Sequence, residues 1–140
     1  MNFIEQKVKH LEMIQDVVKR MASNSFQLKT WTIGIISAVF ALMDKSQVFY
    51  LMPILIVPVF LFWGLDAYFL RLERLYRQLY EDVRQRQEGV DNIDFSLDYR
   101  SYEMQEKTWF QVVKSRTLLV FYGMLSLVII CLIVAKIFPV

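Results

Sequence analysis

An unbroken apolar run near the end of the chain is the feature that most limits how this sequence can fold. Residues 117–135 contain 19 side chains and not one charge. A helix rises about 1.5 Å per residue, so a run of this length crosses the roughly 30 Å hydrocarbon core of a bilayer. The segment predicts a transmembrane helix.

A second uncharged block covers residues 48–65 and ends at Asp66. It contains Pro53 and Pro58. Prolines would interrupt a helix in water, but they are tolerated in lipid where neighbouring groups satisfy the freed carbonyls. We expect a second span here, kinked near Pro58.

A third block is shorter, with only 14 residues between Lys29 and Asp44. Residues 26–43 are long enough to span if Lys29 extends its charged end to the headgroups; the alternative is a buried or interfacial helix. Only residues 44–47 separate this block from the next, and two antiparallel spans require such a short polar connector. The expected fold is an all-α integral membrane protein with three transmembrane helices and cytoplasmic helical extensions.

The basic residues are distributed unevenly along the chain. Of the 16 lysines and arginines, 14 lie in residues 1–29 and 66–116. Because cytoplasmic loops are enriched in Lys and Arg, we expect the N-terminus inside the cell and the C-terminus outside. Trp31, Trp63 and Trp109 then fall near the cytoplasmic ends of their helices, as interface anchors. The net charge of +2 gives no support for direct binding of nucleic acid.

These assignments predict the organisation of the whole chain. It consists of a cytoplasmic amphipathic helix (1–25), a transmembrane hairpin (26–70), a cytoplasmic helical extension with an acidic turnaround near 90–100 (71–116), and a third span (117–138). The apolar stripe of residues 3–22 is expected to cover the stripe of a helix that continues from the second span to Glu88, before Gly89. Ser101 is expected to cap a further helix that runs on into the third span.

The chain has few of the side chains that commonly act in catalysis. His10 is the only histidine and Cys131 the only cysteine. We expect His10 at the surface or in packing, and Cys131 inside the third span, where apolar surroundings disfavour the reactive thiolate. The 4 glycines are scattered and form no phosphate-binding loop. The sequence therefore predicts no catalytic residue, no cofactor, no metal site and no enzymatic activity.

One group of charged residues lies at the mouth of the second span. It comprises Asp66, Arg71, Arg74 and Arg77. A carboxylate at the headgroup boundary needs a partner. We expect Asp66 to pair with a basic residue one or two turns away, or with Lys114 or Arg116, while the arginines bind anionic lipid. The alternatives are a gate or sensor collar at the mouth of an oligomeric pore, and a nucleotide-binding collar that includes Arg84.

Small residues in the spans predict close helix contacts. Gly34 and Ala38 lie one turn apart in the first span, and Gly123 lies in the third. Small side chains let helix backbones approach closely, either within one subunit or between copies. Because three spans cannot readily enclose a water-filled path, a pore would require several copies, and we expect a homo-oligomer in the bilayer.

Two stretches of the chain carry a resemblance: residues 20–42 read RMASNSFQLKTWTIGIISAVFAL, and residues 62–83 read FWGLDAYFLRLERLYRQLYEDV. They resemble small bacterial membrane proteins from phage-defence gene neighbourhoods, often called SLATT-like, which have a cytosolic helix, a close hairpin of spans and a helical extension. The third span is an addition to that pattern. The resemblance implies an inner-membrane effector that permeabilises the membrane when a cytosolic sensor or enzyme triggers it. The alternative is a non-enzymatic scaffold that recruits a soluble partner.

Overall fold

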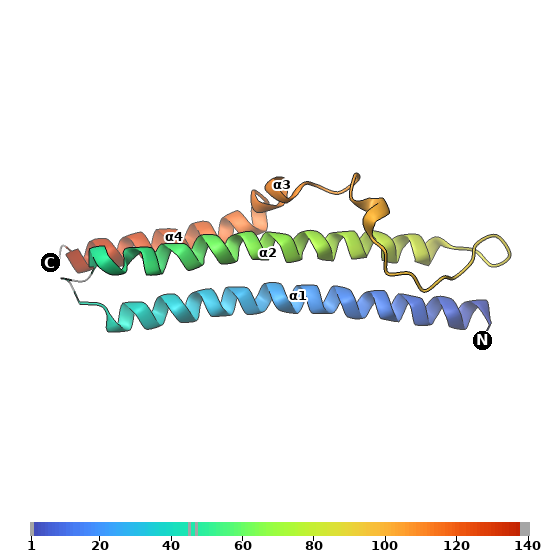
Figure 1. The fold of residues 1–140 in the computed structure, drawn as a ribbon, viewed down its shortest axis with the longest axis horizontal. Coiled ribbons are helices and arrows are strands. Elements are labelled where there is room, and N and C mark those ends of the chain that lie inside the picture. Colours follow the sequence, from blue (N-terminus) through green and yellow to red (C-terminus); the bar gives the residue numbers. More distant parts are fainter. Residues whose placement is uncertain (1, 45, 47, 138–140) are drawn as a thin grey trace.

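Two long helices run side by side and antiparallel along the length of the molecule (Figure 1). The computed structural model describes residues 2–44, 46 and 48–137. Its elements are α1 (Phe3–Leu42), α2 (Val48–Gln85), the 3-10 turn η2 (Arg100–Tyr102), α3 (Trp109–Val113) and α4 (Arg116–Ile137). No strand occurs in these ranges. The predicted end of the third span at residue 138, and residues 45 and 47 of the predicted connector, lie outside the described residues.

Helix α1 is a single helix of 40 residues, although the sequence suggested a cytoplasmic helix and a separate span. Its first turn is closed by a capping box, in which Glu5 N–H donates to Asn2 Oδ1 at 2.8 Å and Asn2 N–H donates to Glu5 Oε2 at 3.1 Å. Residues 22–30 contain neither Gly nor Pro. The predicted boundary at residue 25 is therefore a change of surface chemistry within one continuous helix.

Helix α2 continues from the apolar block into the charged region, as the sequence predicted. It ends at Gln85, a few residues before the predicted end, and Gly89 occupies the left-handed region (φ 82°) in the turn that follows. Lys7 Nζ donates to Arg86 O at 2.8 Å, so α1 supplies a donor to a carbonyl at this helix end.

Three helices are long and apolar enough to cross a membrane. They are Phe3–Leu42, Ile54–Gln85 and Arg116–Ala135, whose most apolar 18-residue windows have mean hydropathies of 1.3, 1.7 and 2.9. The expected all-helical membrane fold is confirmed at this level, because the chain offers three candidate spans and a helical remainder.

The core is divided along the long axis into two clusters. The membrane core joins α1, α2, α3 and α4 through Ile36, Met43, Leu55, Val59, Ala67, Val112, Leu118, Tyr122, Ile129 and Ile133. The extramembrane core joins α1 to α2 through Ile14, Val18, Leu79 and Val83. The predicted packing of the stripe in residues 3–22 on the continuation of the second span is thus confirmed.

The segment between α2 and α3 is irregular over residues 91–99 and lies along the extramembrane core. Ile93 is buried, whereas Asp94 and Asp98 are exposed, as the alternating pattern predicted. Leu97 and Tyr102 pack against the cluster around Leu79. This connector therefore covers apolar surface that the α1 and α2 pair leaves open.

The predicted continuous helix from Ser101 into the third span is wrong. The chain forms η2, then turns, then the short α3, and α4 begins only at Arg116. A second capping box explains the restart: Gln111 N–H donates to the side chain of Thr108, and Thr108 N–H donates to Gln111 Oε1 at 3.1 Å. The chain leaves the α-helix again at Lys114 and Ser115, so α3 and α4 are separate helices.

Candidate functional site

A buried polar site joins the three long helices at the level where their apolar parts begin. The carboxylate of Asp66 in α2 is 0% exposed. Lys29 Nζ in α1 lies 2.5 Å from Asp66 Oδ2, and Tyr122 OH in α4 donates to the same oxygen at 3.2 Å. The hydroxyl of Ser25 donates to Asp66 Oδ1 and accepts a hydrogen bond from Lys29 Nζ at 2.8 Å. We call Ser25, Lys29, Asp66 and Tyr122 the Asp66 site.

Helix geometry accounts for the contribution of α1 to this site. Ser25 and Lys29 are four residues apart, so they lie on one face of the helix and reach the same carboxylate. Lys29 Nζ also lies 5.7 Å from the ring centre of Phe121. The Lys29 side chain is 21% exposed and points into the bundle, although the sequence suggested that it would extend to the headgroups. A carboxylate without water contact needs a nearby cation, and this explains why Lys29 turns toward Asp66 and not toward the headgroups.

The predicted cluster of Asp66 with three arginines does not form. Arg71 Nε donates to Lys107 O at 3.0 Å, Arg74 Nη1 lies 3.8 Å from Glu106 Oε1, and Arg77 Nη2 lies 2.8 Å from Glu73 Oε1. At 100° and 1.5 Å per residue, Arg71 points about 140° away from Asp66, and Arg74 and Arg77 lie roughly 12 Å and 16 Å along the axis. The expected partners Lys114 and Arg116 are also replaced by Lys29.

Two of the three predicted interface tryptophans hold α3 against α2. Trp109 Nε1 donates to Gly64 O at 3.0 Å, and Trp63 Nε1 donates to Val113 O at 3.1 Å. The Trp63 ring stacks on Tyr122 with ring centres 5.6 Å apart and 8° between the planes. Trp31 differs, because it is 65% exposed on α1. The aromatic belt predicted from the sequence is therefore partly an internal clamp beside the Asp66 site.

The sequence placed Gly64 in the group at the mouth of the second span but did not predict its contact with Trp109. A Cβ atom at this position would lie 3.3 Å from Trp109 Cζ2. The indole can approach the α2 backbone and reach its carbonyl because glycine leaves the space free. Ser25, Lys29 and Tyr122 were also missed, since each belongs to a different turn or helix from Asp66 and the rotation of the helices decides whether they meet.

The predicted packing residues face away from the protomer. A Cβ added at Gly34 or Gly123 would meet no atom within 4 Å. Ala38 is exposed on α1. These three small residues therefore do not mediate helix contacts among the described residues of one subunit.

Polar contacts also hold the connector at the far end of α1. His10 is buried, and its Nε2 lies 2.7 Å from Ser96 O, so Nε2 carries the donated proton. Arg86 lies 3.3 Å from both Asp82 and Asp94. The Ser96 N–H, which donates to Asp94 Oδ1 at 3.2 Å, and the Arg86 guanidinium lower the pKa of Asp94. These bonds hold the connector on the helical pair, and His10 has the packing role that the sequence allowed.

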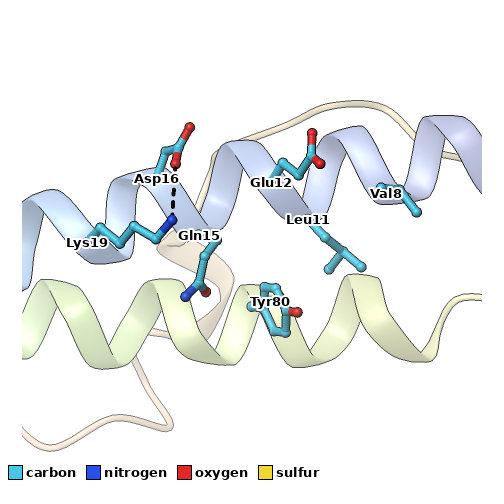
Figure 2. A pocket seen from close by; sticks show the side chains of 7 residues that line it. All are labelled: Val8, Leu11, Glu12, Gln15, Asp16, Lys19 and Tyr80. Atoms are coloured by element: carbon cyan, nitrogen blue, oxygen red, sulfur yellow. Dashed lines mark ion pairs between the residues drawn. The ribbon is translucent and has the colours of Figure 1, made fainter.

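A groove lies between α1 and α2 in the extramembrane part (Figure 2). Its volume is about 280 Å³. It is lined by Val8, Leu11, Glu12, Gln15, Asp16, Lys19 and Tyr80. Lys19 and Asp16 form an ion pair at its edge, 3.9 Å apart. The surface is amphipathic and open to solvent.

The fold and the site define a class: a helical multi-pass membrane protein whose three long helices meet at one buried carboxylate. No three His, Cys, Asp or Glu side chains in the described ranges are grouped as a metal site would require. Comparison with known proteins adds no narrower class, since no family model, no curated protein and no solved structure matches the chain.

Proposed function

We propose that this chain is a self-associating effector of the bacterial inner membrane that permeabilises the bilayer when a cytosolic partner or signal triggers it. The observation that carries the proposal is the outward position of the small residues Gly34, Ala38 and Gly123. In lipid, helices associate through small residues that allow close backbone contact. The chain offers such surfaces on α1 and α4, where no other part of the protomer uses them.

The packing of one protomer supports an assembly as the active form. Leu55, Val59, Tyr122 and Ile129 fill the space between the spans and are nearly inaccessible to solvent. An ion path through a single copy would have to displace this core. A path between copies requires only that their outer faces diverge.

The charge distribution supports the proposed orientation. The chain has 16 basic residues, and only Lys45 and Lys136 lie outside residues 1–29 and 66–116. The positive-inside rule then places the extramembrane core and the connector in the cytosol. A cytosolic sensor or enzyme could contact them there.

The Asp66 site supplies the element that a trigger would act on. Lys29, Asp66 and Tyr122 come from three different helices, so a change in their relative position breaks the ion pair. Loss of one partner from a buried pair is strongly destabilising. A trigger must therefore supply this free energy before the resting packing of the helices changes. The resemblance of residues 20–42 and 62–83 to phage-defence effectors suggests infection as the source of the trigger.

Dye release from liposomes tests the proposal. The full chain, reconstituted alone and with the product of a neighbouring gene, should release an encapsulated dye when the trigger is present. Gly34→Ile and Gly123→Ile should fold but reduce release at least tenfold, because the added side chain blocks contact between copies. Val128→Leu, a change at an exposed position of α4, is the matched control. Full release by both isoleucine variants, or none by the native chain at any protein ratio, rejects the proposal.

A scaffold role is the second candidate, and the groove of Figure 2 favours it. Ile4 and Val8 are exposed beside Leu11 and Tyr80, which gives a soluble partner apolar surface to bind. The apolar stripes of residues 3–22 and 72–83 are otherwise packed on each other in the extramembrane core. A stoichiometric soluble protein that co-purifies with the native chain but not with Val8→Asp, without growth arrest on triggered expression, would favour this role.

A further inference from the structure

The arginines of α2 and the connector that lie beyond Arg71 are all paired with carboxylates. The pairs are Arg74 with Glu106, Arg77 with Glu73, Arg84 with Glu81, Arg86 with Asp82 and Asp94, and Arg100 with Asp98. Their charges are balanced within the chain. They are therefore poor candidates for binding an external anion.

Four cations beside α3 have no such partners. Lys107, Lys114 and Arg116 are exposed, and no carboxylate of the described residues lies within 4 Å of their charged groups. Arg71 donates through Nε to Lys107 O and also lacks a carboxylate partner in this part of the chain. The adjacent acid, Glu106, accepts from Gln78 at 2.7 Å and faces Arg74. We call Arg71, Lys107, Lys114 and Arg116 the basic collar.

The clamp formed by the two tryptophans places the basic collar at the start of the spans. Trp109 and Trp63 bind the Gly64 and Val113 carbonyls, so both ends of α3 are held against α2 one turn from Asp66. Lys107 precedes α3 and Lys114 follows it, while Arg116 is the first residue of α4. The clamp therefore sets the backbone positions of these three cations beside the boundary between the apolar and polar parts.

Aromatic exposure at α3 indicates the same boundary. Phe110 is 73% exposed, whereas Val112 on the opposite side of the short helix is fully buried. Exposed aromatic rings next to Lys and Arg are typical of the headgroup layer, where the ring meets the acyl boundary and the cation meets phosphate. The arginines farther out already have carboxylate partners, whereas the cations on this surface have none.

We propose that the basic collar binds the headgroup phosphate of an anionic phospholipid. Four cations without carboxylate partners, on segments next to an exposed aromatic ring of α3, attract the negatively charged phosphate of such a headgroup. Of the three arginines to which the sequence assigned lipid binding, only Arg71 belongs to this site, because Arg74 and Arg77 are occupied by Glu106 and Glu73.

Lipid titration of the full chain tests this site. The protein in detergent is titrated with phosphatidylglycerol and, separately, phosphatidylcholine, and bound lipids are counted by native mass spectrometry. The native chain should prefer phosphatidylglycerol. K107Q/K114Q/R116Q should weaken that binding roughly 100-fold at low salt, since each cation near an anionic headgroup contributes several-fold. R77Q/R84Q/R100Q changes the net charge by the same amount and should weaken it less than about threefold.

Several results would overturn the assignment. They are an equal loss in both triple variants, no preference of the native chain for phosphatidylglycerol, and displacement of the lipid by millimolar glycerol phosphate, which would indicate a site for free phosphate. K107R/K114R/R116K, which keeps the charges, should retain binding and shows that any loss is not a folding defect. Lipid binding is read without dye release, so its failure and the failure of the proposed permeabilising function are separate results.

Discussion

The two halves of this molecule use polar interactions in opposite ways. In the extramembrane half, ion pairs such as Arg77 with Glu73 and Arg84 with Glu81 lie on the surface, and each contributes little. In the membrane half, the buried carboxylate of Asp66 pairs with Lys29 of α1 and accepts from Tyr122 of α4, so it links the three helices. Where water is excluded, a single polar contact can decide how helices pack, because an unpaired charge has no alternative partner.

Removal of one partner of the buried pair should have the largest effect on the free energy of unfolding. Lys29→Met should lower the free energy of unfolding by about 3–5 kcal/mol, because Asp66 is left buried without a cation. Unfolding in mixed micelles with increasing SDS measures the change. The double variant Lys29→Met with Asp66→Leu should recover most of it. Arg77→Met, at the exposed pair, should lower the free energy of unfolding by less than about 1 kcal/mol. An equal loss at both sites would contradict the difference between the buried and the exposed pair.

The extramembrane half should depend on its apolar core instead. Leu79→Ala should cost about 3 kcal/mol, because it leaves a cavity between α1 and α2. Amide hydrogen exchange should rise in residues 3–22 while the exchange of α4 stays unchanged. Val8→Ala, at a half-exposed position, is the control and should alter exchange only slightly. A simultaneous rise in α4 would show that the halves do not unfold separately.

The clamp at α3 lies between the two halves of the molecule. A larger side chain at Gly64 should disturb the contact of Trp109 with α2. Gly64→Val places methyl groups where Trp109 packs and should cost about 1–2 kcal/mol, with a red shift of the tryptophan emission as the indole leaves α2. Gly123→Val, where an added Cβ meets no atom, should leave the emission unchanged. Unshifted emission in Gly64→Val would mean that the indole is not held at this backbone.

The smallest expected effect is a pH dependence of the connector. The pKa of Asp94 is lowered by the Ser96 N–H and Arg86 from its ordinary value of 3.8. A lowered folded pKa stabilises the docked connector above pH 3.8, and this contribution is lost as the pH falls through the folded pKa. The protection of residues 91–99 from amide exchange, measured relative to the intrinsic exchange rate at each pH, should therefore fall on acidification in the native chain, and less so in Asp94→Asn. Identical pH profiles would exclude Asp94 as the group responsible.

Much of the fold follows from the sequence, because it depends on patterns along single helices. The charge-free runs gave three apolar helices, and the stripes of residues 3–22 and 72–83 gave the extramembrane core. The position of Asp66 at a span boundary marked it as a residue in need of a partner. The capping box of Thr108 and Gln111 was visible in the sequence and could have predicted the separate α3.

The site itself depends on information that no local pattern contains. Lys29 reaches Asp66 across 37 positions in the chain, and only the relative rotation of α1 and α2 selects it over the nearer arginines. The outward position of Gly34 and Gly123 is likewise a matter of rotation. Small residues indicate close approach, but they do not say whether the neighbour is the same chain or another copy.

The uninterrupted course of α1 has a mechanical consequence. His10, which holds the connector, and Lys29, which holds Asp66, lie on one rod of 40 residues without a proline or an irregular turn between them. Successive side chains are about 100° apart around such a rod, so a twist of that size at its N-terminal end would bring Leu28 or Thr30 to the place of Lys29. Torque applied at one end would thus be transmitted without a hinge to the charge pair between the spans.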